Sequence, residues 1–230
     1  MSRQTRMYIP GIPAHVVQRG HNRKACFFAD NDYVLYKEVL AEALGRYGGS
    51  LHAYCLMSNH IHLLLTPLYE DSIQRIFQHM GRQYAQHINQ SYRRTGALWE
   101  GRHRGSLVCE DNYLLACYRY IELNPVNAGM VVMPEDYCWS SYRANGCGAV
   151  DDLLTPHQNY KDLGETSKER CFAYRELFQT PLADQDIHDI RVATKTNRWV
   201  GDARFQERLE NALGRKLSIA KPGRPSLIKK

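Results

Sequence analysis

The chain has 230 residues, of which 43% are hydrophobic and 10% aromatic, so it can bury a full core as one large domain or as a domain with an appendage. This composition excludes a disordered chain. The formal net charge of +6 suits an anionic partner such as nucleic acid, although many soluble proteins carry a similar excess.

The cysteines and the apolar runs indicate the compartment. The seven cysteines are odd in number and scattered, and none forms a C-x-x-C pair, so we expect reduced thiols and neither a disulfide framework nor a zinc ribbon. The first 13 residues lack the apolar core of a signal peptide, and no run approaches the roughly 18 apolar residues of a membrane span. We therefore expect a cytoplasmic protein with no membrane partner.

Hydrophobic periodicity and turn residues predict the local structure. Asp30 or Asn31 can cap the first helix and Asp111 or Asn112 the third. Ser58-Asn59 is a candidate hairpin turn. The predicted elements, in chain order, are a strand over 15–19, a helix over 30–47, strands over 51–57 and 60–66, a helix over 72–92, a strand or extended loop over 97–108, and a helix after residue 112.

This order, βαββαβα, predicts an α+β fold of the ferredoxin-like type, in which helices back an antiparallel sheet on one face. We expect residues 1–150 to form this domain. Residues 151–230 are expected to form a small helical extension, with helices over 184–195 and 201–213 and a basic tail. The extension suits either a small DNA-reading module or a lid over a site.

Four polar side chains in two of these elements suggest a metal-assisted nucleophilic site. If residues 60–66 form a strand, His60 and His62 share a face with Cα atoms about 7 Å apart. Tyr120 and Asn124 are spaced i, i+4 and share a face of a helix. Two imidazoles give a divalent metal two ligands, and the Asn124 amide oxygen is a natural third. A tyrosine beside such a metal suits attack on a phosphodiester.

Simpler interpretations of these residues stay open. Two histidines at i, i+2 in a strand are often structural, and the nearby tyrosines can be packing residues. Zinc bound by Cys55, His60 and His62 would lack a second ligand pair, and a histidine-triad hydrolase would need a histidine where Leu64 stands. If a tyrosine is the nucleophile, the spacing favours Tyr120, with Tyr113 as the fallback.

Combined motifs narrow these choices. The segments Leu56–Leu64 (LMSNHIHLL) and Arg119–Val126 (RYIELNPV) resemble the histidine strand and the tyrosine helix of the single-tyrosine HUH transposases, and most closely of the REP-associated tyrosine transposases. Supporting matches are RGHN at 19–22, LWEGR at 98–102 and WSSY at 139–142. The resemblance covers about residues 1–145.

The resemblance implies a metal-dependent endonuclease and strand transferase that acts on single-stranded DNA at a REP-like hairpin. His60, His62 and Asn124 would bind Mg²⁺ or Mn²⁺, although relatives outside this branch often have glutamine at the last place. Tyr120 would form a 5′-phosphotyrosine link and free a 3′-hydroxyl. Such an enzyme would be associated with the nucleoid, as a monomer or homodimer, and would need no small-molecule substrate.

A basic surface with interspersed aromatic residues is consistent with this partner. Either Trp99 or Tyr84 could stack on bases, and Arg224, in a Gly-Arg-Pro segment, could enter a minor groove or lie in a disordered tail. The candidate phosphate-contacting residues are Arg19, Arg23, Lys24, Arg102, His103 and Arg104.

Two other functions stay open. A rolling-circle replication initiator or relaxase also uses paired histidines and tyrosine, but usually has more tyrosines at the site or an attached helicase. A catalytically idle regulator that binds hairpin DNA would need none of His60, His62, Tyr120 and Asn124.

Overall fold

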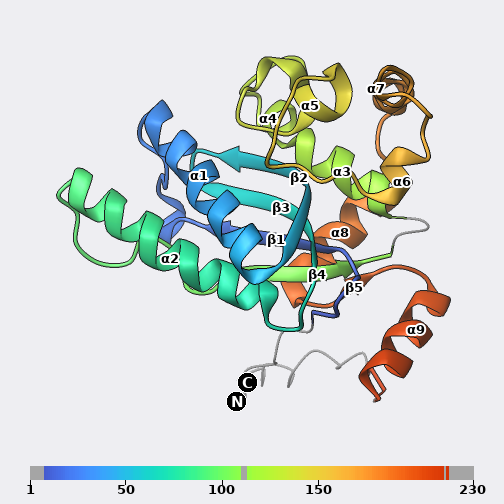
Figure 1. Cartoon of the computed structure of the whole chain (residues 1–230), viewed down its shortest axis with the longest axis horizontal. Coiled ribbons are helices and arrows are strands. Elements are labelled where there is room, and N and C mark those ends of the chain that lie inside the picture. Colours follow the sequence, from blue (N-terminus) through green and yellow to red (C-terminus); the bar gives the residue numbers. More distant parts are fainter. Residues whose placement is uncertain (1–7, 110–112, 215, 218–230) are drawn as a thin grey trace, which may run out of the picture.

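The computed structural model describes residues 8–109, 113–214 and 216–217, and its centre is one five-stranded sheet (Figure 1). The strand order is β2-β3-β1-β4-β5. Strands β1 to β4 pair antiparallel, whereas β5 lies parallel to β4. The strands are β1 (Ala14–Arg19), β2 (Gly49–Met57), β3 (His60–Pro67), β4 (Arg104–Val108) and β5 (Trp199–Val200).

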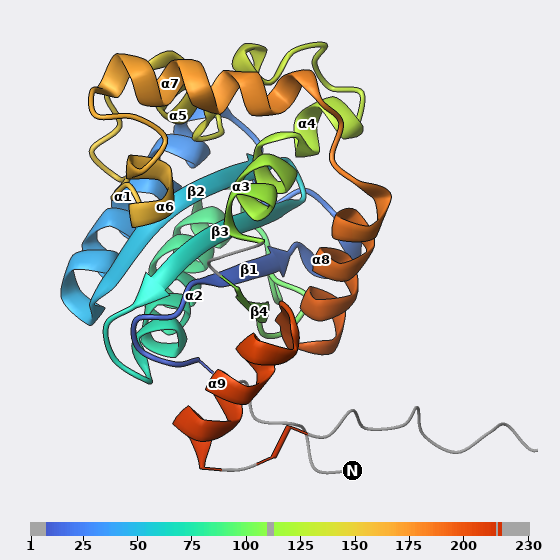
Figure 2. The ribbon, with the colours of Figure 1, turned by 90° about the vertical axis from the view of Figure 1, so that its right-hand side faces the viewer.

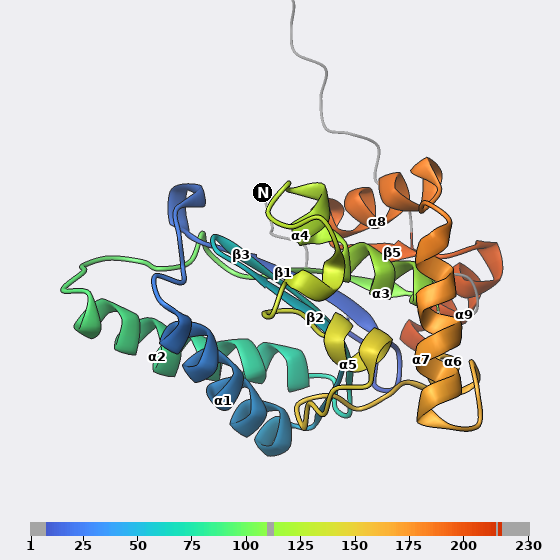
Figure 3. The ribbon, with the colours of Figure 1, turned by 90° about the horizontal axis from the view of Figure 1, so that it is seen from above.

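Helices cover both faces of this sheet (Figure 3). One hydrophobic core lies between the sheet and the helices α1 and α2, and a second lies between the sheet and α3, α5, α7 and α8. The helices are α1 (Asp30–Tyr47), α2 (Ser72–Ser91), α3 (Leu114–Glu122), α4 (Asn124–Asn127), α5 (Tyr142–Cys147), α6 (Gln158–Lys161), α7 (Ser167–Glu176), α8 (Asp184–Thr196) and α9 (Ala203–Leu213). Short 3-10 turns occupy His21–Arg23, Pro134–Asp136 and Leu177–Gln179.

The predicted α+β, ferredoxin-like order is confirmed, but two of its details are wrong. The sheet is mixed because β5 adds a parallel edge strand. Helices lie on both faces of the sheet because β3 is apolar on both of its faces. Leu63 and Leu65 enter the core beneath α1 and α2, and Leu64 enters the second core on the opposite face. A continuous apolar run, unlike an alternating one, is the pattern of a strand covered on both sides.

Most element boundaries match the predicted ranges, and the exceptions have local causes. Helix α1 is capped by neither Asp30 nor Asn31, because the Asp32 carboxylate accepts hydrogen bonds from the backbone N–H groups of Phe28 (2.7 Å) and Ala29 (3.0 Å). Strand β4 is shorter than the predicted 97–108, and residues 97–103 form a loop. The predicted caps at residues 111 and 112 lie outside the described residues.

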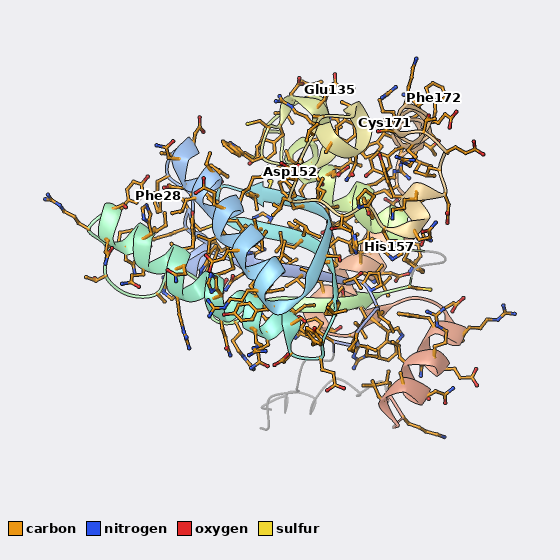
Figure 4. All side chains as sticks on the ribbon, viewed as in Figure 1. Phe28, Glu135, Asp152, His157, Cys171 and Phe172 are labelled. Carbon is orange, nitrogen blue, oxygen red and sulfur yellow. The ribbon has the colours of Figure 1, made fainter. Side chains whose placement is uncertain are left out.

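The region after residue 150 is largely helical, as expected, and part of it belongs to the sheet. Strand β5 pairs with β4, and α8 packs against β4 and β1 (Figure 2). Helix α7, which carries Cys171 and Phe172, lies in the same layer as α5 (Figure 4). The division of the chain at residue 150 stays a prediction, and the tail with Arg224 lies outside the described residues.

All seven cysteines are free thiols. Within the described part of the chain, no helix is both long and apolar enough to span a membrane.

Candidate active site

The two motif histidines share one face at the start of β3, as predicted. The tight turn Ser58-Asn59 brings the chain back from β2, so His60 and His62 follow at the first and third positions of β3. Their ring centroids are 5.0 Å apart and the ring planes meet at 70°. His62 is buried, and His60 is half-buried.

A chain of hydrogen bonds from α8 fixes the orientation of His62. Thr194 on α8 donates its hydroxyl hydrogen to the Ile190 carbonyl (2.8 Å), so its oxygen accepts from Nδ1 of His15 on β1 (3.0 Å). With its proton on Nδ1, His15 accepts at Nε2 from Nδ1 of His62 (2.9 Å). The Nε2 atom of His62 is thereby left with a free lone pair.

The Asn59 side chain orients His60 in a similar way. The Asn59 amide nitrogen donates to the Arg23 carbonyl (3.2 Å), which assigns its other atom as the oxygen. That oxygen lies 2.6 Å from Nδ1 of His60 and accepts its proton. His60 therefore also has an unprotonated Nε2.

Burial keeps these imidazoles neutral. It lowers the pKa of His15 to about 3, and together with the nearby Arg19 cation it lowers the pKa of His60 to about 4. The pKa of His62 falls well below its usual value because of burial and of the neighbouring His15 and His60. Neutral imidazole is the form that ligates metals.

Tyr120 on α3 lies directly over these rings. Its ring centroid is 6.0 Å from that of His62 and 5.8 Å from that of His15, both in edge-to-face geometry. The Arg191 guanidinium carbon lies 5.9 Å from the Tyr120 ring centroid. By contrast, the fallback Tyr113 directs its hydroxyl to the Asp189 carboxylate (3.3 Å).

Asn124 lies four residues after Tyr120, but the two are not on one helix as predicted, because α3 ends at Glu122 and Asn124 begins α4. The Asn124 amide nitrogen donates to the carbonyls of Tyr120 (2.8 Å) and Ile121 (3.2 Å), which leaves its oxygen as the outward atom. Asn124 begins α4, which packs against β2, and the last residue of β2, Met57, pairs with His60.

A buried carboxylate holds α3 in this position. Glu122, between Tyr120 and Asn124 in sequence, accepts hydrogen bonds from Ser141 Oγ (2.5 Å), Asn145 Nδ2 (2.8 Å) and the Tyr174 hydroxyl (2.6 Å). Burial raises the pKa of Glu122 to about 7, although these three hydrogen bonds lower it.

The Tyr120 pocket is the cavity of about 430 Å³ in front of this tyrosine. Among the described residues, its wall has five cationic side chains and a single carboxylate, so it attracts anions such as phosphate. The residues that line it are His15, Val17, Arg19, Arg23, His62, Glu100, Arg104, Tyr120, Arg191, Thr194 and Lys195.

A family comparison agrees with these observations. The model of IS200-like transposases matches residues 9–124, which is half of the chain. The chain belongs to the IS200-like transposase family. The matched segment contains both histidines and Tyr120 and ends at Asn124. A comparison with curated proteins found no match.

Two solved structures resemble this IS200-like transposase. One is described as a REP-associated tyrosine transposase bound to a REP hairpin; it is 17% identical, with a TM-score of 0.56, over 69% of this chain and 93% of its own. The other, a candidate transposase from Deinococcus radiodurans R1, is 23% identical, with a TM-score of 0.37, over 47% of this chain and 87% of its own. The first likeness shows that the two chains share a fold.

The structure separates the predicted DNA-contacting residues of the transposase into two groups. Arg19, Arg23 and Arg104 are exposed and line the Tyr120 pocket. Lys24 and Arg102 are exposed but lie outside that pocket.

Three other predicted DNA contacts are buried and lack the exposed surface that was expected of them. Tyr84 is completely buried and donates its hydroxyl to the Cys26 carbonyl, so it presents no face to a base. Trp99 packs against Tyr84 and is only 7% exposed, so it does not offer a solvent-exposed ring for a base to stack on. His103 packs against Phe77 and does not project into solvent as expected.

Four residues of the site were missed in the sequence. His15 is a single histidine in a strand, and Thr194 lies 179 positions away from it. Arg191 and Lys195 are four residues apart on α8 and therefore share a face, which was a usable signal of a basic stripe. No pattern in the sequence indicated that this stripe faces Tyr120.

Proposed function

We propose that this IS200-like transposase cuts and rejoins single-stranded DNA beside a hairpin, with Tyr120 as the nucleophile. The observation that carries the proposal is the position of the Tyr120 ring, against His62 in a pocket with five cations. The choice of a hairpin as substrate also draws on the solved structure described as bound to a REP hairpin.

The residues at the site fit a divalent cation, Mg²⁺ or Mn²⁺. Hydrogen bonds at Nδ1 hold His60 and His62 with free Nε2 lone pairs, which is the usual arrangement of metal-ligating histidines, and Asn124 has a free amide oxygen. No cluster of three His, Cys, Asp or Glu ligands occurs among the described residues. A cation held by His60, His62 and Asn124 would have three protein ligands, would keep positions for phosphate oxygens and would polarise the phosphate.

The chain's own residues supply the remaining chemistry. The Tyr120 oxygen loses its proton and attacks phosphorus, the bond from phosphorus to O3′ breaks, and O3′ takes up a proton. The product is a 5′-phosphotyrosine and a free 3′-hydroxyl. Attack by a second 3′-hydroxyl reverses the step and rejoins the strand without ATP. Arg191 and the other pocket cations offset the charge of the phosphodiester.

The pocket favours this function over the two alternatives. Tyr120 is the single tyrosine on the pocket wall, and Tyr113 is bonded to Asp189 instead, unlike a site with several nucleophilic tyrosines. An idle DNA-binding protein has no need of two oriented histidines beside a phenol. Nucleoid association stays a prediction, as does the choice between monomer and homodimer.

Incubation of the protein with a labelled hairpin oligonucleotide and Mn²⁺, followed by a denaturing gel and peptide mapping, tests the proposal. We expect a covalent adduct on Tyr120 that disappears in Tyr120→Phe while hairpin affinity is retained, because the phenol contributes little to binding. Tyr113→Phe is the matched control and should form the adduct normally. An adduct that persists in Tyr120→Phe would refute the assignment of the nucleophile.

A further inference from the structure

A second cavity, the α2 pocket, lies on the opposite side of β1 from Tyr120. His15, Val17 and Arg19 on β1 line the Tyr120 pocket, so the intervening Gln18 points to the α2 side. The volume is about 260 Å³, which suits one planar ring system better than a drug-sized molecule. The lining residues are Gln18, Gln74, Phe77, Gln78, Gly81, Trp99, Gly101, Arg102 and His103.

Two residues that line this pocket each have a buried polar atom with no hydrogen-bond partner among the described residues. These atoms are the amide oxygen of Gln18 and the indole N–H of Trp99, and each side chain belongs to a residue that is only 7% exposed. The first accepts a hydrogen bond and the second donates one. Buried polar groups are almost always paired, so these two indicate an occupant that offers both a donor and an acceptor.

An unpaired nucleobase meets these requirements. The edge of a base presents an N–H donor beside an acceptor, and unstacked bases are read through these edges. Phe77 and the ring carbons of Trp99 give the pocket apolar surface for the base, and the exposed Arg102 adds a cation for the adjoining phosphate. A paired base has its Watson–Crick edge occupied, so only a single-stranded or bulged nucleotide can bind this way.

One short loop connects this pocket with the Tyr120 pocket. Glu100 and Arg104 line the Tyr120 pocket, and Trp99, Gly101 and Arg102 line the α2 pocket. A strand that crosses this loop can therefore reach both cavities. We propose, building on the proposed function, that the α2 pocket binds one unpaired base of the DNA strand whose phosphate is attacked by Tyr120.

Gly81 offers a way to fill the pocket without disturbing the fold. It lies inside α2, and a Cβ built on it has no heavy atom within 4 Å, so a leucine side chain can enter the pocket. The change also replaces a poor helix former with a good one. Gly45 on α1 likewise has nothing within 4 Å of its Cβ but does not line the pocket, so Gly45→Leu is the matched control.

The experiment measures the affinity for a hairpin with single-stranded flanks by fluorescence anisotropy, with an abasic site placed at each flank position in turn. For the wild-type protein, one position should weaken binding about tenfold, as expected for loss of one base contact. Gly81→Leu should weaken binding of the intact oligonucleotide to a similar extent. In this variant, an abasic site at that position should cause no further loss of affinity. Gly45→Leu should behave as the wild type, and Gln18→Leu should reproduce part of the loss.

The outcomes separate this inference from the proposed function. If Gly81→Leu binds the intact hairpin like the wild type, or if its effect adds in full to that of every abasic site, the pocket does not hold a base and the inference is overturned. Formation of the Tyr120 adduct by the wild-type protein would leave the proposed function intact in that case. If the wild type binds no hairpin and forms no adduct, both fail.

Discussion

Replacing the Thr194 hydroxyl tests whether α8 controls the protonation of His62 on β3, a proposed metal ligand. Thr194→Val keeps the side-chain shape but removes the oxygen that accepts from His15 Nδ1 at 3.0 Å. The buried N–H of His15 then has no acceptor, which costs about 1–3 kcal/mol. His15 can avoid this cost by moving its proton to Nε2, and His62 must then carry its own proton on Nε2, where a metal would bind.

We expect Thr194→Val to bind Mn²⁺ roughly 10–100-fold more weakly than the wild type, the usual effect of removing an outer hydrogen-bond partner of a metal site. Isothermal titration calorimetry measures the affinity, and long-range ¹H–¹⁵N spectra of the metal-free protein report which ring nitrogens of His15 and His62 are protonated. Thr196→Val is the control, because that hydroxyl donates to the Val192 carbonyl on α8. A wild-type His62 protonated on Nε2 would refute the reasoning, as would an unchanged tautomer and affinity in Thr194→Val.

Three further predictions concern pH, salt and metal. Burial raises the pKa of Glu122 from 4.5 to about 7, so its contribution to stability is present below pH 4.5 and is lost as pH rises through 7. Relative to Glu122→Gln, the wild type should lose about 3 kcal/mol over this range in urea unfolding, and parallel pH profiles would contradict this. Arg191→Gln should reduce the slope of log hairpin affinity against log salt concentration by about one, because one phosphate contact is lost. An unchanged slope would place Arg191 away from phosphate. His62→Ala and EDTA should each abolish the adduct but preserve most of the affinity, and adduct formation in EDTA would exclude the metal.

Local patterns were sufficient to predict the framework of the fold. Strands β2 and β3 and the first two helices appear where alternation, apolar stripes and turn residues placed them, because those signals act over a few neighbouring residues. Strand β5 was missed because two residues, Trp199 and Val200, are too short for any periodicity. The second helical layer was missed although the run Leu63–Leu65 is typical of a strand buried on both faces.

The candidate site was predictable in part for the same reason. His60 and His62 are two residues apart, and Tyr120 and Asn124 are four apart, so each pair could be found from its local spacing. The contact between His15 and Thr194 joins segments that are 179 residues apart, and no local pattern contains such information. The orientation of His62 could be worked out only when both partners were seen in three dimensions.

The contact between the first strand and α8 has a consequence for the newly made protein. Translation delivers His15, His62 and Tyr120 before Thr194, whose hydroxyl orders the imidazole pair. We expect an incomplete polypeptide that stops before α8 to fold much of its sheet without an ordered pair of histidines. If the protein cleaves DNA as proposed, a product that terminates before α8 would then cleave it poorly.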